Sequence, residues 1–130
     1  MSVSATPFLM FEGRCEEALA FYVAGVPGTR VEAIEHWGPG QPAEGKVRLA
    51  RATIAGMAVF ANDSPVHHGF TFTPSISFML EVADEAELDR LVDALGAGGP
   101  FLMPPGNYGF SRKFAWFNDR FGVSWQVNCV

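Results

Sequence analysis

The stretch Phe114–Val127 near the end of the chain has a period of two on either side of a short interruption. Phe114 and Trp116 are two residues apart before it, and Val123, Trp125 and Val127 alternate with the polar Ser124 and Gln126 after it. This period of two is typical of a β-strand, whose successive side chains point to opposite faces. Three residues that favour turns interrupt the alternation: Asn118, Asp119 and Gly122. The pattern predicts two strands joined by a turn, with Gln126 pointing away from the face that carries Trp125.

Two other stretches show the spacing of amphipathic helices. The first runs from about Arg14 to Ala24, and the second begins at Asp84, an N-cap with Glu87 three residues further on. The expected buried faces are Cys15, Ala18, Leu19 and Tyr22 in the first helix, and Leu88, Leu91, Val92 and Leu95 in the second. The remaining predicted strands are Phe8–Phe11, expected to be buried, Thr29–His36, Lys46–Ile54, Met57–Ala61 and Ser75–Val82, followed by a strand fragment and Pro/Gly loop over Phe101–Tyr108.

The two halves of the chain repeat the order strand, helix, strand, strand, strand, over about residues 5–63 and 75–130. Phe8-Leu9-Met10 resembles Phe78-Met79-Leu80, and the segment from Gly56 to Phe60 matches the segment from Gly122 to Gln126. Repeats this short cannot bury their sheets alone. We therefore expect an α+β fold in which tandem βαβββ modules form a cupped sheet, as a single domain of 130 residues.

Composition narrows the classes of partner. The formal net charge of −5 argues against nucleic acid and anionic membrane surfaces, which require clustered positive charge. No apolar run approaches the roughly 20 residues that span a bilayer, and the N-terminal residues lack the features of a signal peptide. The two cysteines, Cys15 and Cys129, are far apart and have no metal-type spacing, which indicates reduced thiols in a cytoplasmic protein.

Four motifs in both halves resemble the vicinal oxygen chelate superfamily, which includes glyoxalase I, extradiol dioxygenases and the fosfomycin- and bleomycin-resistance proteins. Within it the sequence is most similar to the PhnB-like group, often labelled 3-demethylubiquinone-9 3-methyltransferase-like. The motifs lie at residues 7–11, 16–22, 70–78 and 119–127. The resemblance implies paired βαβββ modules and a homodimer.

Metal-dependent members of that superfamily hold a divalent ion with His and Glu on the first and last strands of the modules. The matching places here are Pro7, Phe60, Ser77 and Gln126. Pro and Phe cannot ligate, Ser is a poor ligand, and Gln offers one neutral oxygen, whereas such sites require about three ligands of the His or carboxylate type. We therefore expect no metal. No glycine-rich nucleotide loop supports a methyltransferase, and no other cofactor is indicated.

Five residues are candidates for binding a small molecule in the predicted cup: Leu9, Ser77, Arg112, Trp116 and Gln126. Leu9 is two residues from Pro7 and so shares its face, and Arg112 shares a strand face with Phe114 and Trp116. The sequence leaves alternatives open. Ser77 and Gln126 could bond a ligand or, equally well, bond each other or water. The aromatic residues Phe114, Trp116 and Trp125 are more often part of a core, and an arginine at such a position also reaches solvent at a rim.

The chain also has three histidines and several helix carboxylates that could take part in chemistry, and we interpret them as solvated or structural. His67 and His68 are adjacent in a loop, where joint chelation is unfavourable, and His36 has no partner visible in the sequence. The helix carboxylates Glu16, Glu17, Glu85 and Glu87 are interpreted as solvated. The function expected is that of a metal-free small-molecule binding protein with an unidentified ligand; the alternative is a metal-dependent lyase or dioxygenase of the same superfamily.

Overall fold

A computed structural model describes residues 2–130, which fold as two compact units. The first ends at Thr71 and the second covers Phe72–Val130. Each contains one of the predicted repeats, and the boundary falls in the segment that connects β4, which ends at Asp63, to β5, which begins at Phe78.

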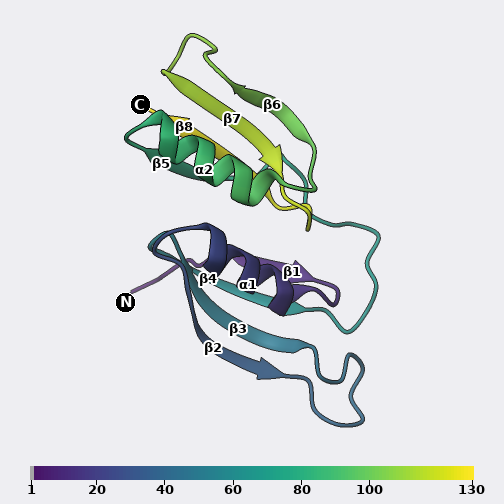
Figure 1. The fold of residues 1–130 in the computed structure, drawn as a ribbon. Coiled ribbons are helices and arrows are strands. Elements are labelled where there is room, and N and C mark those ends of the chain that lie inside the picture. The colour runs from purple at the N-terminus through teal and green to yellow at the C-terminus, as the bar shows by residue number, and fades with distance from the viewer. Residues whose placement is uncertain (1) are drawn as a thin grey trace. The chain divides into compact units, whose positions relative to one another are not determined.

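The first unit contains a mixed four-stranded sheet and one helix (Figure 1). Its elements are β1 (Phe8–Phe11), α1 (Cys15–Gly25), β2 (Arg30–His36), β3 (Val47–Ile54) and β4 (Met57–Asp63). The strand order is β1-β4-β3-β2, with β1 parallel to β4 and the other neighbours antiparallel.

The second unit repeats this arrangement. Its elements are β5 (Phe78–Val82), α2 (Glu85–Gly96), β6 (Phe101–Gly106), β7 (Lys113–Asn118) and β8 (Ser124–Cys129). The strand order is β5-β8-β7-β6, with β5 parallel to β8. The predicted α+β class with two βαβββ modules is confirmed, and neither sheet closes on itself.

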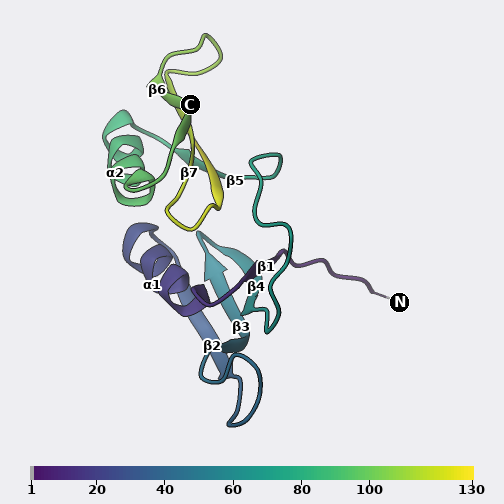
Figure 2. The ribbon, with the colours of Figure 1, turned by 90° about the vertical axis from the view of Figure 1, so that its right-hand side faces the viewer.

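Each helix covers one face of the sheet in its own unit (Figure 2). The predicted apolar faces of both helices are buried as expected. Alternating strand residues meet them, such as Ala50, Ala52 and Val59 in the first unit and Phe117, Trp125 and Val127 in the second. The opposite face of each sheet, called the open face below, is not covered by the helix of its unit. Within residues 2–130, neither helix is long and apolar enough to cross a bilayer.

Three strand predictions need correction. β1 is not wholly buried, because Phe8 lies on the open face and is 54% exposed. β5 starts at Phe78, three residues later than predicted. β6 continues through Pro104 and Pro105 as far as Gly106, where a loop was expected. β6 is an edge strand, and an edge position tolerates proline because its backbone N–H need not join the ladder.

The two helices begin differently. Asp84 caps α2 locally, since its Oδ1 accepts a hydrogen bond from the backbone N–H of Glu87 at 2.8 Å. The residue before α1 is Arg14, whose side chain makes no capping bond. Instead Oδ1 of the buried Asp63, from β4, accepts from the backbone N–H groups of Gly13 at 2.7 Å and Cys15 at 3.0 Å. Strand and helix of the first unit are therefore joined by one carboxylate.

Candidate functional site

The open face of the second sheet brings together three of the five predicted binding residues. Trp116 of β7 lies directly opposite Gln126 of β8 in the antiparallel register, so both side chains emerge on the same face. Ser77 precedes β5 and, because Phe78 pairs with Trp125, lies beside Ser124. Met79 of β5 is the other neighbour of Gln126 and is 51% exposed.

A chain of hydrogen bonds holds the indole of Trp116 in place. Nε1 of Trp116 donates to Oγ of Ser124 at 2.9 Å, and Oγ of Ser124 lies 2.7 Å from Oγ of Ser77. Ser124 is only 2% exposed, so the centre of this network is shielded from water, while Trp116 and Ser77 at its two ends are partly accessible. The ring of Trp116 is therefore fixed at its polar edge, while the residue as a whole stays partly accessible.

Gln126 is half-buried, and its side-chain amide makes no hydrogen bond with any residue from 2 to 130. Ser77 pairs with Ser124 rather than with Gln126, so the alternative in which Ser77 and Gln126 bond each other does not occur in this structure. A primary amide can both donate and accept. The face thus offers an oriented aromatic ring beside an amide that has not been used internally.

The other aromatic candidates belong to packed regions. Trp125 is fully buried on the face beneath α2, and its Nε1 donates to Oδ2 of Asp119 at 2.8 Å. Phe114 is on the open face but is covered by ring contacts with Tyr108 at 6.3 Å and Phe110 at 5.0 Å. Trp125 and Phe114 are therefore core residues in this structure.

Neither Arg112 nor Leu9 belongs to the open face that carries Trp116. The Arg112 guanidinium donates to the carbonyl oxygens of Val130 at 2.7 Å and Ala83 at 2.6 Å, at the end of the sheet opposite to Ser124. Leu9 is 8% exposed and pairs with the buried Ala61, so it belongs to the covered face of the first sheet. Alternation shows which residues share a face, but it does not show which face the helix covers.

The four inherited metal places do not fit a divalent ion. Phe60 contacts the ring of Phe8, with centroids 6.2 Å apart, and Ser77 is engaged by Ser124. The backbone carbonyl of Pro7 accepts from the N–H of Phe60, and Pro7 has no side-chain donor atom. Across residues 2–130 no three His, Cys, Asp or Glu side chains converge as a cation site. Among the side chains at these four places, only the neutral amide of Gln126 has an oxygen that is free to bind a metal ion.

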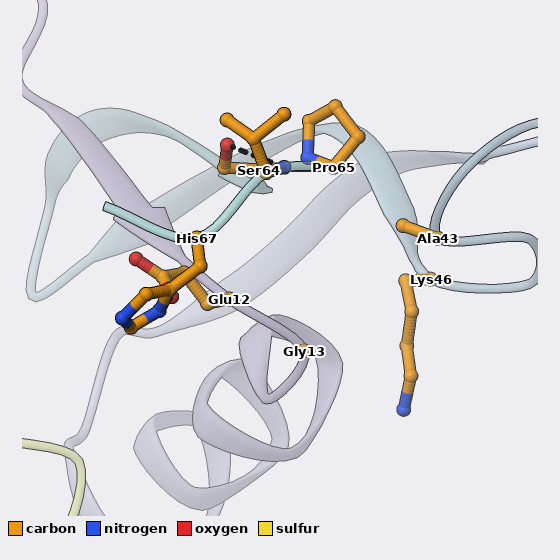
Figure 3. A pocket seen from close by; sticks show the side chains of 8 residues that line it. Glu12, Gly13, Ala43, Lys46, Ser64, Pro65 and His67 are labelled. Carbon is orange, nitrogen blue, oxygen red and sulfur yellow. Dashed lines mark hydrogen bonds and ion pairs between the residues drawn. The ribbon is translucent and has the colours of Figure 1, made fainter.

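A surface hollow of about 420 Å³ lies in the first unit (Figure 3). It is lined by Glu12, Gly13, Ala43, Lys46, Ser64, Pro65, Val66 and His67. Figure 3 shows Glu12 and His67 together on one side and Lys46 extending away from both. Most polar side chains around the hollow already form hydrogen bonds within the protein, so it is a weaker candidate site than the open face of the second sheet.

The histidines beside this hollow fasten the chain after β4 to the end of β1. Nδ1 of His67 lies 2.7 Å from Oε1 of Glu12, and the backbone N–H of His68 donates to Oε2 at 3.1 Å. The ring of His68 bonds the hydroxyl of Ser64 at 2.8 Å. The hydrogen bond between Glu12 and His67, followed by the one from the His68 backbone, lowers the pKa of Glu12 below its ordinary value. These contacts agree with a structural role for both histidines.

The sequence did not predict two residues of this open face, Ser124 and Met79, or the partner of His36. Ser124 and Met79 belong to the face of Trp116; period-two spacing from Gln126 signalled Ser124, but Met79 required the strand register. His36 does have a partner, since its Nε2 lies 2.8 Å from Oε1 of Glu16. Cys15 is buried as expected, and burial raises the pKa of its thiol to about 12.

Comparison with known proteins places this arrangement in a family. The family model described as 3-demethylubiquinone-9 3-methyltransferase matches residues 3–128. The structure of the PhnB protein from Bacillus cereus is 40% identical, covers 98% of this chain and 100% of its own, and superposes with a TM-score of 0.94. Protein PA1353 from Pseudomonas aeruginosa is 36% identical over 98% of both chains, with a TM-score of 0.85.

More distant proteins share the fold alone. A mutant of the fosfomycin resistance protein FosX from Listeria monocytogenes, complexed with Mn(II) and a dihydroxypropylphosphonic acid, is 11% identical with a TM-score of 0.66 over 100% of this chain and 94% of that one. TnmS3, an antibiotic binding protein from Streptomyces sp. CB03234, is 21% identical with a TM-score of 0.57 over 99% and 98%. The chain therefore belongs to the PhnB-like family described as 3-demethylubiquinone-9 3-methyltransferase, and it has the fold of the glyoxalase/bleomycin-resistance proteins.

Proposed function

We propose that this protein binds a flat, partly polar small molecule on the open face of its second sheet, without a catalytic metal. The observation that carries the proposal is the indole of Trp116, held by Ser124 and placed directly opposite the unengaged amide of Gln126. Aromatic rings fixed in this way bind planar ligands by stacking, and a few polar groups then set the orientation.

The donor set supports binding over metal-assisted chemistry. FosX was crystallised with Mn(II), whereas TnmS3 is named an antibiotic binding protein, so this fold accommodates both kinds of function. In the present chain the inherited places carry Pro7, Phe60, Ser77 and Gln126, and three of these four have no effective ligand group. A binding role requires only the residues that the chain has.

The test combines a titration with elemental analysis. Oxindole, a flat bicyclic lactam, serves as the probe, and its affinity for each variant is measured by isothermal titration calorimetry. In the wild type, the indole N–H signal of Trp116 in NMR spectra should also shift on binding. We expect Trp116→Ala to weaken binding by about 1–3 kcal/mol, because the stacked area is lost. Trp37→Phe, a change in the first unit, is the matched control and should bind oxindole like the wild type.

Elemental analysis of protein purified without chelator addresses the alternative function. Stoichiometric Zn, Ni, Mn or Fe that disappears in Gln126→Ala would contradict the metal-free proposal and favour a lyase or dioxygenase. Oxindole binding that survives unchanged in Trp116→Ala would contradict the placement of the site.

We also propose that the protein is a cytoplasmic homodimer. The family resemblance and two buried free cysteines support this, together with exposed apolar side chains such as Phe70, Ile76 and Phe110. Analytical ultracentrifugation at micromolar concentration should give the mass of two chains, and a monomer at that concentration would count against the dimer.

A further inference from the structure

We propose that the ligand of this open face is an uncharged planar molecule with a carbonyl oxygen, and that Ser77 donates a hydrogen bond to that oxygen. The inference rests on the proposed function and adds the class of ligand. It follows from the direction of the hydrogen bonds around Ser124 and from the charges on the face.

The direction is set by Ser124, whose hydroxyl is almost completely buried. Its oxygen already accepts the indole N–H of Trp116, and its own proton needs an acceptor because an unpaired buried donor costs free energy. The one acceptor within hydrogen-bond distance, among the residues described, is Oγ of Ser77 at 2.7 Å. Ser124 therefore donates to Ser77.

This direction leaves the hydroxyl proton of Ser77 without an internal acceptor. Ser77 is only half-buried, so its O–H can turn toward whatever occupies the open face. Hydrogen bonds in such a chain polarise one another, and the last donor of the series is strengthened. The series Trp116, Ser124, Ser77 thus ends in a donor, and its natural partner is an acceptor oxygen on the ligand.

Charge decides which oxygen is suitable. Among the strand residues of the second sheet that share the face of Trp116, the charged one is Glu81, which pairs with Asn128 two places beyond Gln126. Arg112 is engaged at the far end of the sheet by two backbone carbonyls. A carboxylate or phosphonate would meet no cation among the described strand residues on this face of the second sheet, so a neutral carbonyl fits the face better than an anion.

Three planar bicyclic probes separate these properties: oxindole, indole and an indole carboxylate. Indole has the same shape as oxindole but no carbonyl. We expect oxindole to bind about 5- to 10-fold more tightly than indole, as one added hydrogen bond allows, and the carboxylate to bind more weakly than oxindole. Ser77→Ala should bring oxindole to the affinity of indole and leave the affinity of indole itself unchanged.

Two further variants control for damage to the site. Ser75→Ala removes a neighbouring exposed hydroxyl and should leave all three affinities unchanged. Ser77→Cys preserves the volume but supplies a weak donor, so it should resemble Ser77→Ala even if the alanine variant is unstable. Indole binding reports whether the stacking surface of Trp116 is intact in each variant.

The outcomes distinguish this inference from the proposed function. If all three probes bind through Trp116 but Ser77→Ala weakens indole and oxindole equally, or if the carboxylate binds most tightly, the ligand class is wrong and the site stands. If none of the probes binds in a way that depends on Trp116, both the ligand class and the proposed function are overturned.

Discussion

The two units build the same order of elements, but they secure the start of their helices by different means. In the second unit the cap is local, because Asp84 lies three residues from the N–H that it accepts. In the first unit the carboxylate comes from Asp63, about fifty residues along the chain, and it also accepts from the N–H of Val47 at 3.0 Å. The local cap ties a helix to itself, whereas Asp63 ties together a helix, the strand β4 and the start of β3.

The open faces differ as well. On the first open face Phe60, in ring contact with Phe8, lies opposite Arg51, whereas on the second open face Gln126 lies opposite Trp116. The repeat therefore preserves the framework while the exposed chemistry of each half diverges. The comparison predicts that structural and binding roles are unevenly divided between the units, and the following changes test it.

The largest effect is expected for Asp63→Ala. Three backbone N–H groups would lose a charged acceptor, two of them in buried bonds, so we expect a loss of about 3–5 kcal/mol in the free energy of unfolding. Urea unfolding followed by tryptophan fluorescence measures the change. A loss below about 1 kcal/mol would mean that the carboxylate does not join these elements.

The second effect is expected for Asp119→Ala in the turn before β8. Its Oδ1 accepts from the N–H groups of Phe121 and Val123, and its Oδ2 from the indole of Trp125. All three donors lie within six residues of Asp119, so the loss loosens one turn and does not separate distant segments, and we expect about 2–4 kcal/mol. The same urea experiment applies, and a red shift of the Trp125 emission should accompany the loss.

A smaller effect is expected for Asp84→Ala. The variant removes the same charge as Asp63→Ala but only a local cap, which is typically worth about 1 kcal/mol. It is therefore the matched control for the first experiment. Equal losses in the two variants would remove the distinction between a local and a long-range cap.

The smallest effect concerns the contact between Glu12 and the two histidines. Because its pKa is lowered in the folded state, ionised Glu12 stabilises this contact above pH 4.5, and the contribution disappears as the pH falls through the lowered value. The His68 amide signal in NMR spectra should move with a midpoint below 4.5. Glu12→Gln should abolish the transition, and a midpoint at or above the ordinary value would contradict the lowered pKa.

The framework could be predicted from the sequence because its signals are local. Helical spacing identified the buried faces of α1 and α2, and alternation placed Gln126 on the side opposite to Trp125. β1 was ambiguous because all four of its residues are apolar, so the pattern does not show which of Phe8 and Leu9 is covered.

The remaining features depend on contacts between residues distant in sequence. Nothing near Asp63 shows that it bonds the start of α1, and nothing near His36 shows that it meets Glu16. Alternation alone assigned Arg112 to the binding face. In the structure its guanidinium is held at the end of the sheet by the backbone carbonyls of Val130 and Ala83. Local sequence patterns do not reveal these contacts, because the contacts form only when segments distant in sequence pack together.

The positions of the three tryptophans make the protein its own spectroscopic probe. Trp37 reports on the first unit through its bond to the Asp63 carbonyl, Trp125 reports on the core of the second, and Trp116 reports on the face proposed to bind ligand. Single Trp→Phe variants would resolve the emission into these three sources. Unfolding of either half and occupation of the face could then be followed separately in one unlabelled sample.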